Sequence, residues 1–152
     1  MLKLLKSYCV FIDNSMKKLF DKEFIDQLFA EAAESPRLRQ NHDLRNSADD
    51  TSQRMLNALM SDTVVPIHQH TETAETVICL CGKLEEVLYE REEVVKEDGT
   101  SEVTFVETAR YLLCPGHGAY GMQIPAGVWH TVNVIEPSVI FEAKDGAYVP
   151  VK

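Results

Sequence analysis

The sequence lacks an excess of basic residues and any long apolar run. Lys and Arg number 15 against 24 Asp and Glu, so the formal net charge is -9. Binding to nucleic acid needs a basic surface that neutralises phosphates, and this charge balance argues against it. No segment approaches the roughly 20 consecutive apolar residues that cross a bilayer as a helix. We therefore expect neither a nucleic acid nor a membrane as a partner.

The sequence also lacks the glycine-rich phosphate-binding loop and the nucleophile elbow of two common enzyme classes. Cysteine is scarce, and Cys9, Cys79, Cys81 and Cys114 do not form a disulfide framework. A chain of 152 residues buries enough apolar surface to fold without disulfides. Cys79 and Cys81 share one face of a predicted strand, where packing in the core is favoured over metal binding. Reduced thiols and a cytoplasmic location are therefore expected.

The first residues do not fit a secretory signal peptide. Lys6 interrupts the apolar stretch of Met1–Ile12, and no small-residue cleavage site follows it before Asp13. We expect an N-terminal extension at 1–15, an N-terminal helix and connecting loop at 16–51, and a β-barrel at 52–152, all in one structural domain. The apolar piece Tyr8–Ile12 is predicted to pair with a sheet edge, such as that of a second subunit.

Apolar residues at helical spacing predict a helix over Lys22–Ala33, with Asp21 as its N-cap. The polar stretch Arg37–Thr51 is predicted to be a surface connection. From residue 52 onward, short β-like runs alternate with turn residues, as in an antiparallel sandwich or barrel. The Asp-Gly pair within Glu97–Thr100 predicts a tight two-residue hairpin turn. The predicted strands are Gln53–Met60, Val64–His70, Thr76–Cys81, Lys83–Glu93, Val94–Lys96, Val103–Glu107, Tyr111–Cys114, Gly121–Ile124, His130–Ile135 and Val139–Lys144.

Histidines cluster at a spacing that suits a metal site. His68 and His70 are two positions apart and point to the same face of an extended strand. Glu75 follows after a short turn, and His130 joins them if the two segments pair in one barrel. Three imidazoles and one carboxylate are a common ligand set for a divalent transition metal. The alternative is a set of polar barrel residues that hold no metal.

The stretch from Asp62 to Val134 resembles the cupin superfamily. The first motif of that family is G-x5-H-x-H-x3,4-E-x6-G, and the chain departs from it by having Asp62 at the leading glycine. The second motif is G-x5-P-x-G-x2-H-x3-N, and Ala119 and Val134 replace its first and last residues. The positions that match the two motifs are His68, His70, Glu75 and Gly82, then Pro125, Gly127 and His130.

The cupin resemblance implies a mainly β fold, a double-stranded β-helix or jelly-roll barrel with a short N-terminal helix. It also implies one divalent metal ion per chain, held by His68, His70, Glu75 and His130. Iron, manganese, nickel, cobalt and zinc all suit three nitrogens and one oxygen. An octahedral ion would keep two positions open, so iron, manganese or nickel is favoured if the protein is an enzyme.

A narrower resemblance, to WbuC-type cupin metalloproteins, runs over most of the chain from Met16. That family takes its name from bacterial O-antigen polysaccharide gene clusters. The segments that carry the resemblance are Ser35–Arg39, Gln53–Leu59, Ile124–Thr131 and Phe141–Gly146.

These resemblances imply a metal-dependent enzyme acting on a small polar substrate, a carbohydrate or organic acid, linked to bacterial surface polysaccharide biosynthesis. Related metal cupins include dioxygenases, decarboxylases and sugar isomerases, and the ligand set does not choose among them. The alternatives are a sugar- or metabolite-binding protein without turnover, and a barrel that uses its metal only for stability. We also expect a small-molecule ligand and a homodimer.

Two further residues are candidates for the substrate pocket. Arg54 and Asn57 are three positions apart on one predicted strand, so only one of them should face the pocket. Arg54 is the preferred candidate, because a guanidinium binds carboxylate or phosphate with two hydrogen bonds. A surface salt bridge is the alternative role for Arg54. Gln123, two residues before Pro125, is the second candidate.

Overall fold

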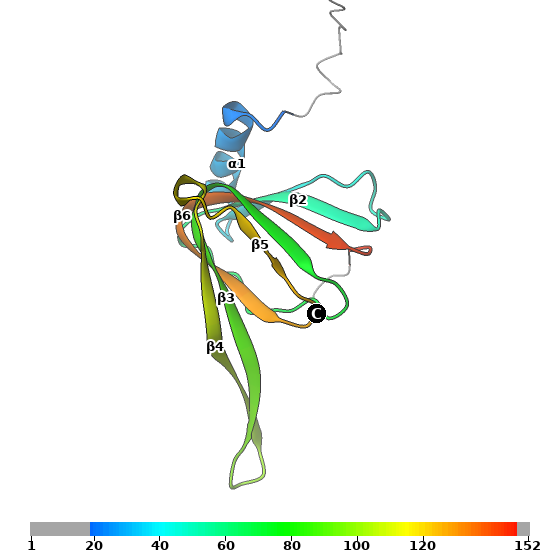
Figure 1. Cartoon of the computed structure of the whole chain (residues 1–152), viewed down its shortest axis with the longest axis vertical. Helices are drawn as coiled ribbons and strands as arrows, with labels where there is room; N and C mark the ends of the chain where they lie inside the picture. Colours follow the sequence, from blue (N-terminus) through cyan, green and yellow to red (C-terminus); the bar gives the residue numbers. More distant parts are fainter. Residues whose placement is uncertain (1–18, 149–152) are drawn as a thin grey trace, which may run out of the picture.

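The computed structural model describes residues 19–148 and is built around an antiparallel sheet that curls into a barrel (Figure 1). The sheet has the order β1-β2-β6-β3-β4, and β5 pairs with β3. The predicted extension at 1–15, including Tyr8–Ile12, lies outside the described residues. The elements are α1 (Lys22–Glu34), β1 (Arg39–Asp43), β2 (Ser52–Leu59), β3 (Glu75–Val95), β4 (Ser101–Leu113), a single-turn 3-10 helix η2 (Pro115–His117), β5 (Gly121–Ile124) and β6 (Trp129–Asp145).

Helix α1 forms where the sequence predicts it. The Asp21 carboxylate accepts a hydrogen bond from the backbone N–H of Phe24 at 3.0 Å, which confirms the predicted N-cap. The buried face of the helix, with Leu28 and Ala32, packs against Leu56 and Val139 of the sheet. The helix therefore covers one face of β2 and β6 and leaves their other face to line the barrel.

The polar stretch after α1 is not only a surface connection. Its residues Arg39–Asp43 form β1, which pairs antiparallel with β2, so that Arg39 lies opposite Leu59. β1 is an edge strand held by backbone hydrogen bonds, and it buries little apolar surface. An alternating apolar pattern, the usual sequence signal for a strand, is therefore missing.

The predicted strand Val64–His70 is wrong. In this segment only His68 pairs with another strand residue, in an isolated bridge to His130. Elsewhere the short predicted strands join into longer ones. β3, β4 and β6 each unite runs that the sequence separates at turn-forming residues such as Gly82 and Pro137. These strands bend at those residues and continue.

The bend in β3 and β6 brings distant parts of the two strands together. Glu75, at the start of β3, lies opposite Lys144, whereas Leu88, thirteen positions later, lies opposite His130. Thirteen residues of straight strand span roughly 43 Å. The register shifts between Cys79 and Leu84 mark the place where the two paired strands turn. The bend closes the barrel, so that both ends of β6 face one interior.

Gly82 occupies the inside of this bend. Its φ of 91° lies in the left-handed region, and an added Cβ would overlap Pro137 O and Ser138 Oγ on β6. Ser138 is fully buried; its hydroxyl accepts from the Lys83 N–H at 2.9 Å and donates to Glu136 O at 2.7 Å. The glycine therefore allows β6 to approach closely enough for the serine to link the two bent strands.

Beyond the barrel, β3 and β4 continue as a two-stranded hairpin that projects away from the rest of the chain (Figure 1). The predicted hairpin forms, with Gly99 at φ 83°. Its turn is longer than two residues, because Lys96 N–H donates to Thr100 O and encloses three residues between them. This longer turn needs a positive φ only at the glycine.

Replacing Gly82 with Ala is expected to lower the free energy of unfolding by about 3 kcal/mol or more, since the methyl group overlaps β6 as well as straining the backbone. Gly99→Ala is the matched control, because its φ is similar but nothing lies within 4 Å of an added Cβ. That variant should cost only about 1 kcal/mol. Urea denaturation of both variants measures the difference, and equal losses would contradict the role of the bend.

Candidate metal centre

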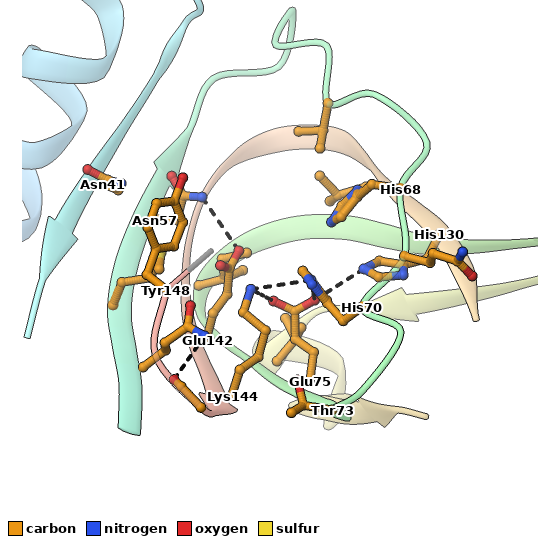
Figure 2. A pocket seen from close by; sticks show the side chains of 18 of the residues that line it. Asn41, Asn57, His68, His70, Thr73, Glu75, His130, Glu142, Lys144 and Tyr148 are labelled. Atoms are coloured by element: carbon orange, nitrogen blue, oxygen red, sulfur yellow. Dashed lines mark hydrogen bonds and ion pairs between the residues drawn. The ribbon is translucent and has the colours of Figure 1, made fainter. Parts of the chain in front are cut away.

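Four side chains from separate segments converge inside the barrel (Figure 2). His68 and His70 come from the loop before β3, Glu75 begins β3, and His130 lies near the start of β6. One ligand atom from each residue lies within 4.8 Å of those of the others. Glu75 and His130 are only 4% and 3% exposed. We call these four residues the His–Glu cluster.

Backbone hydrogen bonds hold the histidine loop in place although it is not a strand. His68 and His130 exchange N–H···O bonds of 3.0 and 2.8 Å, and the Gly127 N–H donates to His70 O at 2.7 Å. Both histidines of the loop are thereby tied to the chain around His130. The argument from strand alternation led to the right cluster, but the side chains converge through this irregular pairing.

Backbone carbonyl groups orient two of the imidazoles. Nδ1 of His68 donates to Pro66 O at 2.9 Å, and Nδ1 of His130 donates to Val128 O at 2.9 Å. Each ring therefore directs its Nε2 into the cluster, which is the usual arrangement of a metal-binding histidine. The acceptor in each case is the carbonyl two residues earlier. Because every residue carries a carbonyl, no side-chain pattern in the sequence reveals it.

Glu75 divides its two oxygens between the histidines and a lysine. Oε2 lies 3.1 Å from His130 Nε2 and 3.3 Å from His70 Nε2, while Oε1 accepts from Lys144 Nζ at 2.9 Å. Lys144 Nζ is also 3.3 Å from His70 Nε2. Burial alone would raise the pKa of Glu75, but the hydrogen bonds from His130 and His70 and the charge of Lys144 hold that pKa well below its usual range.

Lys144 was missed at the sequence level. It lies opposite Glu75 in the register of β3 and β6, so its ammonium group reaches the carboxylate directly. The only signal in the sequence is a lysine near the end of a predicted strand. Nothing in that pattern tells which residue lies across from it.

The surroundings shift the pKa values of His68 and His130 in opposite directions. Burial and the nearby His130 lower the pKa of His68. Burial is the largest influence on His130 and acts to lower its pKa, but the hydrogen bonds with Glu75 and Val128 and the charges of Glu75 and Glu86 together raise that pKa. Both ring nitrogens of His130 face acceptors, an arrangement that favours the protonated imidazole.

The His–Glu cluster forms one wall of a cavity of about 770 Å³. The other walls come from the inner face of β2 and from β3 and β6. Lys144 lies between the cluster and these walls (Figure 2). The lining residues outside the cluster that bear on its chemistry are Arg39, Gln53, Asn57, Glu86, Glu142, Lys144 and Tyr148.

The two residues predicted to face the pocket do not line this cavity. In β2 the odd-numbered residues face the cavity, so Asn57 lines it and Arg54 points to the other face. The Arg54 guanidinium instead donates to Asp50 at 3.0 Å and to Leu44 O at 3.2 Å. Gln123 lies opposite Thr76 in β5, on the exposed face of that pair. In both strands the side chains alternate between two faces, and the predicted residue lies on the face that points away from the cavity.

Two further carboxyl groups face the cavity. Glu86 lies in a glutamate-rich part of β3, yet it is only 3% exposed. Burial raises the pKa of Glu86 to about 8, against a smaller opposing influence of His130. Burial likewise raises the pKa of Glu142, which accepts a long 3.5 Å hydrogen bond from Asn57. Leu84, Glu86 and Val87 are all buried, although a regular strand would put Val87 on the opposite face from the other two. A simple alternation of buried and exposed residues therefore does not single out Glu86.

A family model described as a domain of unknown function (DUF6016) matches residues 20–100, more than half of the chain. The chain belongs to this family. No curated protein matches the DUF6016 chain. Its described residues contain no helix long and apolar enough to cross a membrane.

Solved structures with the same fold share little sequence with the DUF6016 chain. A conserved protein of unknown function from Streptococcus pyogenes (SPY1581) has a TM-score of 0.52 at 11% identity, over 76% of this chain and 80% of that one. Oxalate oxidase in complex with the substrate analogue glycolate has a TM-score of 0.49 at 10% identity, over 76% of this chain and 55% of that one. The cupin domain of Schizosaccharomyces pombe Cnp3 has a TM-score of 0.45 at 10% identity, over 71% and 64%.

The fold is therefore the expected one. It is a mainly antiparallel β barrel with one short helix, and it resembles the fold of the Streptococcus pyogenes protein.

The raised pKa of Glu86 has a consequence for stability. The unfolded chain loses the Glu86 proton near pH 4.5, whereas the folded chain keeps it until about pH 8. Folding stability should therefore fall as the pH rises from about 5 to 8 and then level off. Glu86→Gln removes this loss, so the variant should gain on the order of a few kcal/mol relative to the parent protein between pH 5 and 8.

Denaturation in the presence of a chelator at several pH values measures this difference. Glu90→Gln is the control, since Glu90 is exposed on the hairpin. If the difference in the free energy of unfolding between Glu86→Gln and the parent protein does not change with pH, the pKa of Glu86 is not raised by folding.

Proposed function

We propose that this chain is a metal-binding cupin protein and that its His–Glu cluster holds one divalent transition-metal ion. The observation that carries the proposal is the convergence of four ligand atoms within 4.8 Å. Two of the three imidazoles have Nδ1 engaged by backbone carbonyls and Nε2 directed inward. Three nitrogens and one carboxylate oxygen fit iron, manganese, nickel, cobalt or zinc.

We further propose that the protein is a metal-dependent enzyme that acts on a small polar molecule in the cavity. A bound divalent ion would supply Lewis-acid or redox chemistry to such a molecule. The chain itself supplies Glu86, which is buried, and Glu142, which is half-buried; both are carboxyl groups with raised pKa values that line the same cavity. Groups that exchange protons near neutral pH are what an enzyme needs beyond its metal ligands, and a purely structural metal would need neither.

The narrower resemblance to WbuC-type proteins adds a biological setting to the proposal. It rests on the segments Ser35–Arg39, Gln53–Leu59, Ile124–Thr131 and Phe141–Gly146. It points to a carbohydrate or organic-acid substrate linked to bacterial surface polysaccharide, in the cytoplasm. The homodimer also stays a prediction, and sedimentation measures it.

His130→Ala is expected to reduce bound metal from about one ion per chain to nearly none, because the ring supplies a central ligand atom. His117→Ala is the matched control, since His117 is exposed on η2 and lies outside the cluster. Elemental analysis of protein dialysed against each metal ion measures the content. A His130→Ala protein that still binds one ion per chain would contradict the site.

Lys144→Met is expected to strengthen metal binding by tenfold or more. The Lys144 ammonium lies 2.9 Å from Glu75 and 3.3 Å from His70, so its positive charge opposes a cation bound by the same atoms. Competition with a coloured chelator measures the affinity, and Lys96→Met, which removes a charge from the exposed hairpin, is the control. Weaker binding would instead show that Lys144 mainly positions Glu75.

A further inference from the structure

Polar side chains outside the His–Glu cluster also line the cavity, and one of them carries a hydrogen-bond acceptor that has no donor. Asn57 Oδ1 is buried and has no partner among residues 19–148. The Glu86 side chain, 3% exposed, lines the same cavity. Glu142 Oε1 receives only the 3.5 Å contact from Asn57. Buried polar groups are nearly always paired, so the unpaired Asn57 oxygen beside these two carboxyl groups indicates a ligand that donates a hydrogen bond there.

The charges of the lining disfavour an anionic ligand. Of the described lining residues, only Arg39 and Lys144 are lysine or arginine, against five acidic side chains. Lys144 is paired with Glu75, and Arg39 donates to Val64 O at 2.6 Å. A dicarboxylate placed beside Asn57 would find no free cation there and would meet the unpaired amide oxygen, another acceptor, whereas a hydroxyl group can donate to that oxygen.

An aromatic ring completes the arrangement. Tyr148 lines the same cavity as Asn57 and Glu142 and is 53% exposed (Figure 2). The faces of aromatic rings are apolar and carry partial negative charge, and they pack well against the C–H groups of a sugar ring. A flat apolar ring beside several hydrogen-bond acceptors suits a molecule that has both hydroxyl groups and C–H faces.

We infer that the cavity binds a neutral, hydroxyl-rich molecule, a sugar or polyol, through Asn57, Glu86 and Glu142, with Tyr148 packing against its carbon skeleton. The inference rests on the proposed function, because the metal centre forms another wall of the same cavity. It chooses between the two substrate classes left open above: a carbohydrate fits the lining, and a small organic acid does not. A hydroxyl group both donates and accepts, so it pairs with the amide and with either form of the carboxyl groups.

Zinc-loaded protein can be tested against four neutral probes (glucose, galactose, mannose and myo-inositol), two dicarboxylates (oxalate and succinate) and the amine putrescine. Saturation-transfer NMR and calorimetry measure binding. At least one neutral probe should bind more tightly than both dicarboxylates and the amine. Asn57→Leu and Glu86→Leu should each weaken that binding by about tenfold, since each removes a buried acceptor. Asn133→Leu, at an exposed position outside the cavity, is the control and should have no effect.

Zinc content measured on the same samples separates this inference from the proposed function. Protein that takes up no zinc overturns the proposed function, whatever the sugars do. Protein that binds zinc but prefers a dicarboxylate or the amine, or binds none of the neutral probes, overturns the inference alone. The inference also fails if a neutral probe binds equally well to the parent protein and to both leucine variants.

Discussion

Where β3 and β6 bend together, the backbone of Gly82 lies against Pro137 and Ser138, with no room between them for a side chain. This contact turns two long paired strands through the corner that closes the barrel. Without it, the start of β3 and the start of β6 would be far apart, because their cross-strand partners are thirteen positions apart along β3. The 3.1 Å approach of Glu75 to His130 therefore depends on a corner that neither residue touches. Gly82, the last residue of the first motif, is therefore required for the closure that brings the histidines and Glu75 together.

Alternate residues of β2 point to opposite faces of the sheet, one packed against α1 and the other lining the cavity. Leu56 and Ala58 pack under α1 and build a core that is fully buried. The residues between them face the cavity, where Asn57 meets Glu142. Packing of the helix therefore sets which polar side chains of β2 face the cavity, since a shift of one residue would exchange the two faces. The same parity places Arg54 on the helix side of the sheet, where it pairs with Asp50.

The sequence predicts the cluster better than its surroundings, for a physical reason. His68, His70, Glu75 and His130 have fixed spacings within two motifs, so their pattern survives even though the loop before β3 is not the expected strand. Lys144 and Glu86 become relevant only through cross-strand register and barrel closure, which no local pattern records. Helix α1 was predictable because its cap and apolar face are local. β1 was not, because its partner lies in another segment and its own side chains are polar.

The barrel holds several carboxyl groups together because their charges are balanced in different ways. The pKa of Glu75 lies well below its usual range, and its carboxylate is matched by Lys144 and by the hydrogen bond with His130. Burial makes ionisation costly for the other two carboxyl groups: it raises the pKa of Glu86 to about 8 and raises the pKa of Glu142 as well. A divalent ion on the ring nitrogens would add positive charge to the cluster. That charge would favour the ionised forms of Glu86 and Glu142, which line the same cavity. The cluster and these carboxyl groups are already coupled electrostatically, since the charges of Glu75 and His130 act on the pKa of Glu86.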